Sequence, residues 1–91
     1  MIYLEIDFNE FKKREGIIID IREKEEYIKN HLPNSINISF YQLIVYPSKY
    51  LDKKKKYLLV CNYGIKSKKT SEILNRNGYH TFSLKKGYKG L

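Results

Sequence analysis

The chain has 91 residues, of which 42% are hydrophobic and 31% charged, and its formal net charge is +8. This composition is that of a globular domain and excludes a disordered chain, and no apolar run is long enough to span a bilayer. The length predicts one domain over residues 1–91 with a single modest core.

The charge is divided unevenly between the two halves of the chain. Residues 1–46 contain six Lys/Arg and eight Asp/Glu, whereas residues 47–91 contain twelve and two. The basic half predicts either a lysine-rich solvated surface or a face that attracts anions or an acidic partner. Because no recognition-helix pattern accompanies the charge, nucleic-acid binding is disfavoured.

In the first half of the chain, strands and helices alternate. The predicted elements are a strand over 3–6, a helix capped by Asp7, a strand over 17–21, a helix over 23–29, a strand over 36–38 and a helix capped by Ser39. Asp7 and Glu10 have capping-box spacing, and Phe8 and Phe11 are expected to share the inner face of their helix. The β-branched run at 17–21 is typical of a strand covered on both sides.

The second half continues the alternation. The predicted elements are a buried strand over 57–60, a helix over 67–77 and a strand over 81–84. In the long helix, Thr70, Ile73 and Leu74 are expected to face inward, and Gly78 to end it. The pattern predicts an α/β fold: a small, mostly parallel sheet of about five strands with helices on both faces.

Three strand ends carry residues suited to a site, and parallel strands bring such ends to one edge of a sheet. They are Asp20-Ile21-Arg22, the loop that starts at Cys61, and Lys85-Lys86-Gly87. The topology therefore predicts that all three converge.

Cys61 is the only cysteine, at the junction between a buried strand and a helix start. Unpaired backbone N–H groups and the positive end of a helix dipole favour the thiolate there. A lone cysteine excludes an internal disulfide, and with no basic leader at Met1 a cytoplasmic protein is expected. The two histidines and one cysteine are scattered, so no metal site or cofactor is predicted.

Four segments, in order along the chain, resemble the motifs of the rhodanese-like domains, a family of sulfurtransferases with a catalytic cysteine. They are Asp-Ile-Arg at 20–22, Asn-His-Leu-Pro-Asn-Ser-Ile-Asn-Ile at 30–38, Cys-Asn-Tyr-Gly-Ile-Lys-Ser at 61–67 and Lys-Gly-Tyr-Lys-Gly-Leu at 86–91. The family usually has glycine at the positions of Asn30, Asn34 and Lys86, arginine at Lys66, and tryptophan at Leu91. Asparagine tolerates left-handed backbone. Lysine keeps the positive charge but cannot bind an oxyanion through two hydrogen bonds as arginine does. This difference is expected to affect substrate preference more than reactivity.

The resemblance implies a sulfurtransferase that moves sulfane sulfur from thiosulfate, or another persulfide donor, through a Cys61 persulfide to an external thiol or to cyanide. The expected substrate-binding residues are Asn62, Tyr63, Gly64, Ile65, Lys66 and Ser67. Lys66, with Lys85 or Lys86, is expected to attract the anionic donor. Asp20 and Arg22 are expected to support the loops beside the site, although Arg22 also has the spacing to pair with Glu26.

Two alternatives remain. The first is a non-catalytic binding module of the same fold, in which the basic half docks an acidic protein and Cys61 is inert. The second is a phosphatase or arsenate-reducing relative. The four residues between Cys61 and Lys66 resemble the sulfur-handling members, whereas the phosphatase relatives have one residue more.

Overall fold

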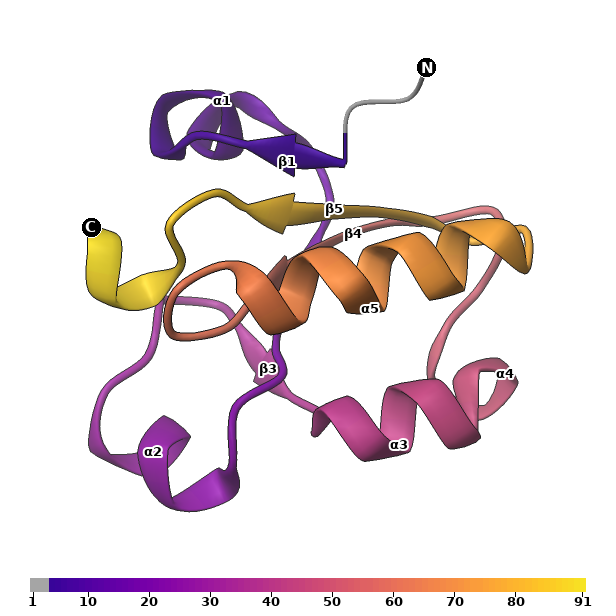
Figure 1. Cartoon of the computed structure of the whole chain (residues 1–91), viewed down its shortest axis with the longest axis horizontal. Helices are drawn as coiled ribbons and strands as arrows, with labels where there is room; N and C mark the ends of the chain where they lie inside the picture. The colour runs from indigo at the N-terminus through magenta and orange to yellow at the C-terminus, as the bar shows by residue number, and fades with distance from the viewer. Residues whose placement is uncertain (1–3) are drawn as a thin grey trace.

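A five-stranded parallel sheet forms the centre of the computed structural model, which describes residues 4–91 (Figure 1). The strand order is β1-β5-β4-β2-β3. The strands are β1 (Glu5–Ile6), β2 (Ile17–Asp20), β3 (Ile36–Asn37), β4 (Lys56–Val60) and β5 (His80–Leu84). The predicted α/β fold is confirmed, and every strand pair in the described part of the chain is parallel. Tyr3, predicted to start the first strand, lies outside the described residues.

In the described part of the chain, six helical segments surround the sheet. They are α1 (Phe8–Lys13), α2 (Lys24–Lys29), α3 (Phe40–Val45), α4 (Pro47–Tyr50), α5 (Ile65–Arg76) and the 3₁₀ turn η1 (Tyr88–Gly90). Asp7 caps α1 by accepting from the Glu10 amide at 2.9 Å, and Ser39 caps α3 in a full capping box with Gln42. Both predicted caps are confirmed. The short helix α4 was not predicted, although proline at its first position favours a helix start.

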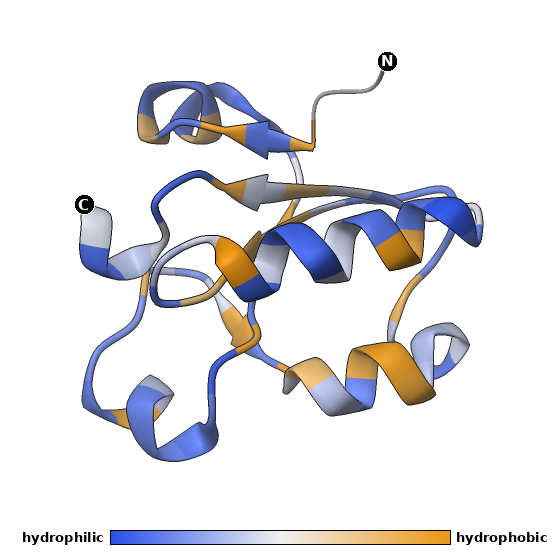
Figure 2. Cartoon of the chain, viewed as in Figure 1, coloured by the Kyte–Doolittle hydropathy of each residue, from blue (hydrophilic) through white to orange (hydrophobic). Residues whose placement is uncertain are grey.

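Buried apolar residues cover both faces of the sheet, and Figure 2 shows that hydrophobic residues also occur in the surrounding helices, as in α3. On one face Ile19, Leu59 and Cys61 pack with residues of α3 and α5. On the other, Leu58, Val60 and Leu84 pack against Phe11 of α1 and are joined by residues such as Ile6. Successive residues of β4 pack on opposite faces of the sheet, and both faces are covered. An unbroken apolar run can therefore form a single strand.

Helix α5 starts at Ile65, two residues before the predicted start at Ser67. Gly64, with φ 87°, forms the turn into the helix in place of a capping side chain. Thr70 and Leu74 are buried as predicted, but Ile73 is 37% exposed, so its predicted inward position is wrong. Gly78 ends the helix in the left-handed conformation, as predicted.

The predicted inner face of α1 is half correct. Phe11 is 5% exposed and belongs to the core, whereas Phe8 is 38% exposed and stacks on Phe11 from outside, with 6.5 Å between ring centroids. A six-residue helix turns less than twice, so only one side of it meets the sheet.

Among residues 4–91, two non-glycine residues have left-handed backbone, Asn34 with φ 66° and Lys86 with φ 69°. Both occupy positions where the family motifs have glycine. The third such position, Asn30, is extended with φ −159°. Asparagine adopts left-handed backbone at low cost, whereas lysine does not.

We expect Lys86→Gly to raise the free energy of unfolding by about 1 kcal/mol, because relief of left-handed strain exceeds the entropic cost of glycine. Asn34→Gly is the matched control and should be nearly neutral. Urea unfolding of both variants measures the difference. Equal effects at the two positions would show that strain at Lys86 is not the cause.

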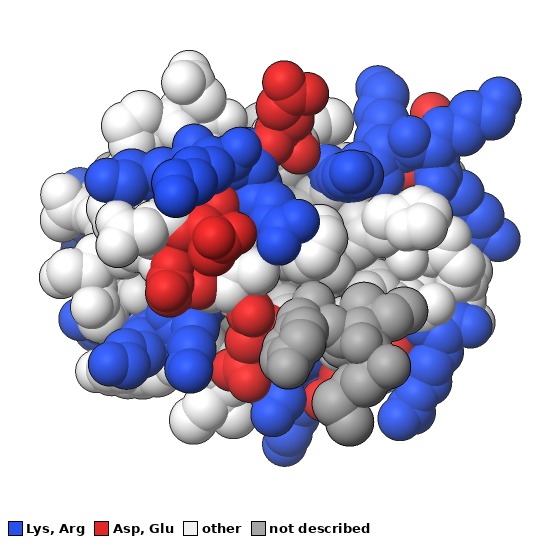
Figure 3. Space-filling view, turned by 90° about the horizontal axis from the view of Figure 1, so that it is seen from above, with Lys and Arg blue, Asp and Glu red and all other residues white. Residues whose placement is uncertain are grey.

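Lysine and arginine side chains are spread around the face that carries β1 and α1, with carboxylates among them (Figure 3). Two of these carboxylates form ion pairs, Glu5 with Lys68 at 3.4 Å and Glu10 with Arg14 at 3.7 Å. Exposed pairs of this kind contribute little to stability. Across residues 4–91, the helices are too short or too polar for any one of them to traverse a bilayer.

Candidate functional site

The three strand ends predicted to converge do so around the loop between β4 and α5. Cys61 follows β4 directly and is 5% exposed. The chain after β5 crosses this loop, since the Tyr88 amide donates to the Cys61 carbonyl at 2.7 Å. The chain after β2 reaches it through Arg22, whose Nη1 donates to Asn62 Oδ1 at 3.3 Å.

The Cys61 sulfur is surrounded by hydrogen-bond donors from the start of α5. The backbone amides of Gly64 and Ser67 donate to Sγ at 3.1 and 3.3 Å, and Ser67 Oγ lies 3.2 Å from it. These amides are the groups that a helix start leaves without an intrahelical partner. They favour negative charge on the sulfur, as does the helix dipole.

Gly64 and Gly87 bring the loop and the segment after β5 into close contact. A Cβ on Gly64 would lie 2.9 Å from the Lys86 nitrogen and 3.1 Å from the Leu84 oxygen. A Cβ on Gly87 would lie within about 2.5 Å of the backbone carbonyls of Cys61 and Asn62. Glycine at both positions therefore permits the contact that shapes the loop.

Arg22 and Asp20 lie beside the loop, to which Arg22 is hydrogen-bonded. The two side chains form a buried ion pair, with 2.9 Å between Arg22 Nη2 and Asp20 Oδ2, and Arg22 Nε also donates to both carboxylate oxygens. Arg22 donates further to the Asn30 carbonyl at 2.6 Å. The side-chain hydrogen bond with Asp20 raises the pKa of Arg22, against the lowering effect of burial, so this guanidinium stays charged.

Asn62 is held from two sides. Its Oδ1 accepts from Arg22, and its Nδ2 donates to Glu26 Oε2 at 2.8 Å. Arg22 and Glu26 do not form the direct ion pair that was the predicted alternative. Asn62 lies between the two charges instead, and the ion pair formed by Arg22 is with Asp20. The Tyr88 ring covers the guanidinium, with 4.4 Å from Arg22 Cζ to the ring centroid.

A pocket of about 560 Å³ opens beside Cys61. It is lined by Arg22, Glu23, Glu26, Phe40, Cys61, Asn62, Tyr63, Ile65, Lys66, Lys69 and Ile73. Of the predicted loop residues, Gly64 and Ser67 do not line it, and their backbone amides are hydrogen-bonded to the sulfur instead. Tyr63 lines the pocket and is 63% exposed.

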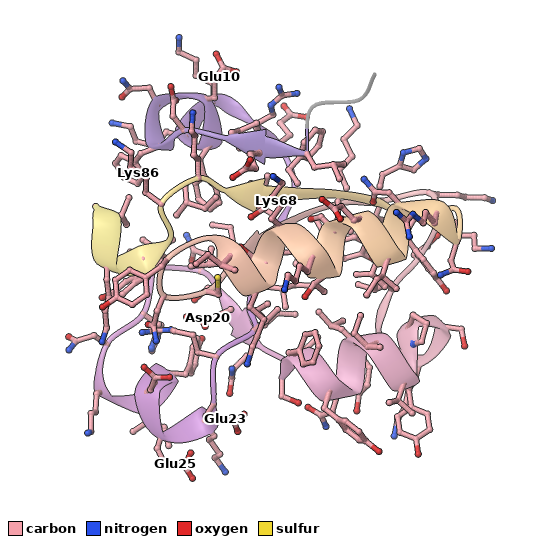
Figure 4. The ribbon with its side chains drawn as sticks, in the orientation of Figure 1. Glu10, Asp20, Glu23, Glu25, Lys68 and Lys86 are labelled. Atoms are coloured by element: carbon pink, nitrogen blue, oxygen red, sulfur yellow. The ribbon has the colours of Figure 1, made fainter. Side chains whose placement is uncertain are left out.

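The lysines predicted to attract an anion do not all line the pocket. Lys66 lines the pocket, and its Nζ lies 5.2 Å from the centroid of the Phe40 ring. Lys85 and Lys86 do not line the pocket. Figure 4 shows Lys86 on the side of β5 that faces α1, whereas Asp20 lies below the first turn of α5. Of the lysines predicted to attract an anion, Lys66 is therefore the one that lines this pocket, and a role for Lys85 or Lys86 stays a prediction.

Several pocket residues were not predicted. Lys69 and Ile73 follow Ile65 by four and eight residues, so helical spacing would have indicated a shared stripe. Phe40, from the first turn of α3, carried no such signal because its place depends on how α3 packs beside α5. Within residues 4–91, no three His, Cys, Asp or Glu side chains are grouped so as to hold a metal ion.

His31 is engaged outside the pocket. Its Nδ1 lies 2.7 Å from the Tyr27 carbonyl, and its ring stacks on the Tyr27 ring with 3.9 Å between centroids. The Tyr27 hydroxyl donates to the Ser35 carbonyl. These contacts hold the loop between α2 and β3 to the end of α2.

The sequence and the fold are similar to those of known proteins. The family model described as Rhodanese-like domain matches residues 7–91. The thiosulfate sulfurtransferase GlpE of Coxiella burnetii is 33% identical over 79 residues, which are 86% of this chain and 73% of that protein. The tRNA sulfurtransferase of Thermoplasma acidophilum is 36% identical over 78 residues, which are only 15% of its length. A crystal structure of a rhodanese-related protein from Thermoplasma volcanium has a TM-score of 0.83 at 30% identity and covers 97% of this chain and 89% of that one.

Proposed function

This chain belongs to the family of rhodanese-like domains, and from that premise we propose that it is a sulfurtransferase that carries sulfane sulfur as a persulfide on Cys61. The observation that supports the proposal best is the set of polar groups around the sulfur. Two backbone amides donate to Sγ, the Ser67 hydroxyl lies 3.2 Å from it, and Cys61 lines a pocket. Such a set stabilises a thiolate nucleophile.

The reaction has two displacements at sulfur. The Cys61 thiolate attacks the outer sulfur of thiosulfate, the sulfur–sulfur bond of the donor breaks, and sulfite leaves with the electron pair. An acceptor thiolate then attacks the outer sulfur of the persulfide, and the Cys61 thiolate leaves. No second cysteine exists in the chain to complete the transfer internally, so the acceptor is an external thiol, or cyanide in an assay.

The pocket favours an organic thiol as acceptor over cyanide. Its volume of about 560 Å³ lies in the range of sites for organic ligands. Phe40 of α3 and Ile65 and Ile73 of α5 supply an apolar wall, and Lys69 of α5 supplies a positive charge. A thiol that carries an apolar segment and an anionic group fits this lining.

The test of the proposal is the intact mass of the protein after brief incubation with thiosulfate. We expect a gain of one sulfur atom that a reductant or cyanide removes, because the persulfide sulfur is open to attack. Cys61→Ser should show no gain, since serine cannot form a persulfide.

Sulfur gain by Cys61→Ser would contradict the assignment of Cys61. If the wild-type chain gains no sulfur from thiosulfate, from mercaptopyruvate or from a protein persulfide, the proposal of a sulfurtransferase fails. Slow alkylation of Cys61 by iodoacetamide at neutral pH would then favour the binding module with an inert cysteine.

A further inference from the structure

A buried serine on β5, Ser83, is connected to the Cys61 sulfur through Ser67. Ser83 Oγ lies 2.6 Å from Ser67 Oγ, and Ser67 Oγ lies 3.2 Å from Cys61 Sγ. Both serines are 0% exposed. In the described part of the chain, Ser67 is the one hydrogen-bond partner of the Ser83 hydroxyl.

The hydrogens that Cys61, Ser67 and Ser83 can donate limit the directions of the hydrogen bonds among the three side chains. A serine hydroxyl has one hydrogen to donate and can accept as well. When Cys61 is a thiol, its S–H can donate to Ser67, and either serine hydroxyl can donate to the other. When Cys61 is a thiolate, its sulfur can only accept, so Ser67 donates to the sulfur and accepts a hydrogen bond from Ser83. Ionisation of Cys61 thus reverses the bond between Cys61 and Ser67 and leaves Ser83 as the donor to Ser67.

The position of Ser83 in the sheet is one where an apolar side chain would be expected. Thr81 and Ser83 face α5, while Phe82 and Leu84 face the other layer. Placing a hydroxyl between a sheet and a helix costs free energy unless it is hydrogen-bonded. Here the compensating bond is to the group that touches the reactive sulfur.

We propose that Ser83 is a positioning residue, which holds the Ser67 hydroxyl with its hydrogen directed at the Cys61 sulfur whenever that sulfur is negatively charged. The predicted effect of Ser83 on sulfur transfer rests on the proposed function. Its predicted effect on the reactivity of the Cys61 sulfur does not. Ser71 provides a contrast, because its hydroxyl is equally buried and has no hydrogen-bond partner.

The experiment compares Ser83→Ala and Ser83→Gly, which both lack the hydroxyl, with Ser71→Ala as the matched control. The rate of Cys61 alkylation by iodoacetamide is measured against pH, together with the rate of sulfur gain from thiosulfate. Without Ser83, we expect the midpoint of the alkylation profile to move to higher pH and sulfur gain to slow about fivefold, the equivalent of one neutral hydrogen bond. Ser71→Ala should leave both unchanged.

A double variant separates positioning from general packing. If Ser83 acts through Ser67, then Ser83→Ala adds nothing in a Ser67→Ala background. Additive effects, or equal effects of Ser83→Ala and Ser71→Ala, would overturn the proposal. Alkylation needs no sulfur donor, so it tests Ser83 even if the wild-type chain gains no sulfur and the proposed function fails.

Discussion

Arg22→Met is expected to lower the free energy of unfolding by about 3–5 kcal/mol, because it leaves a buried carboxylate without its partner. Asp20 is 1% exposed, and Arg22 supplies three hydrogen bonds to it from Nε and Nη2. Methionine fills a similar volume and removes the charge, so the loss reflects the ion pair together with the other hydrogen bonds of the guanidinium. Urea denaturation followed by circular dichroism measures it.

The control is the double variant Asp20→Asn with Arg22→Met, in which neither charge is left alone. We expect it to lose clearly less stability than Arg22→Met, because the cost of an uncompensated buried charge is absent. Equal losses in the two proteins would indicate that the bonds from Arg22 to Asn30 and Asn62, and not the ion pair, are what stabilises the fold.

Gly87→Ala is the second change with a large expected effect. The backbone at Gly87 has φ 68°, and an added Cβ would meet the carbonyls of Cys61 and Asn62 at distances that no real Cβ adopts. Left-handed strain and overpacking together are expected to cost roughly 2–5 kcal/mol. Because the cysteine loop must move to relieve the contact, sulfur gain from thiosulfate should fall as well.

Gly78→Ala tests the cost of backbone strain at a glycine that makes no tight contact with another backbone segment. Gly78 has a similar φ of 92°, but an added Cβ there would touch only the flexible side chain of Lys53, at 3.4 Å or more. We expect a loss of about 1–2 kcal/mol and an unchanged rate of sulfur gain. If Gly87→Ala loses no more than this in urea denaturation, the tight contact between the two segments is not important for stability.

The sequence allowed most of the fold to be predicted because local patterns and tertiary packing agree in this chain. Buried runs at 17–21 and 57–60 mark the two central strands, and the caps at Asp7 and Ser39 mark two helix starts. The errors fall where one local signal has two interpretations. Ser67 has the character of a helix cap, yet its side chain turns to the Cys61 sulfur and the helix starts earlier.

The candidate site was predictable in part. The topology of parallel strands was enough to bring Arg22 and Cys61 to one edge, and spacing along α5 contained the stripe of Ile65, Lys69 and Ile73. The role of Ser83 was not predictable. A lone serine in a strand gives no sign of which layer it faces until the register with β4 and the position of α5 are known.

Two backbone amides after β5 report on the cysteine loop, because they are hydrogen-bonded to it. The Tyr88 and Lys89 amides donate to the carbonyls of Cys61 and Asn62, more than twenty residues earlier in the chain. Their hydrogens exchange with solvent only when the contact between the two segments opens. The exchange rates at residues 88 and 89 therefore measure how often the cysteine loop is released, without a probe attached to the cysteine.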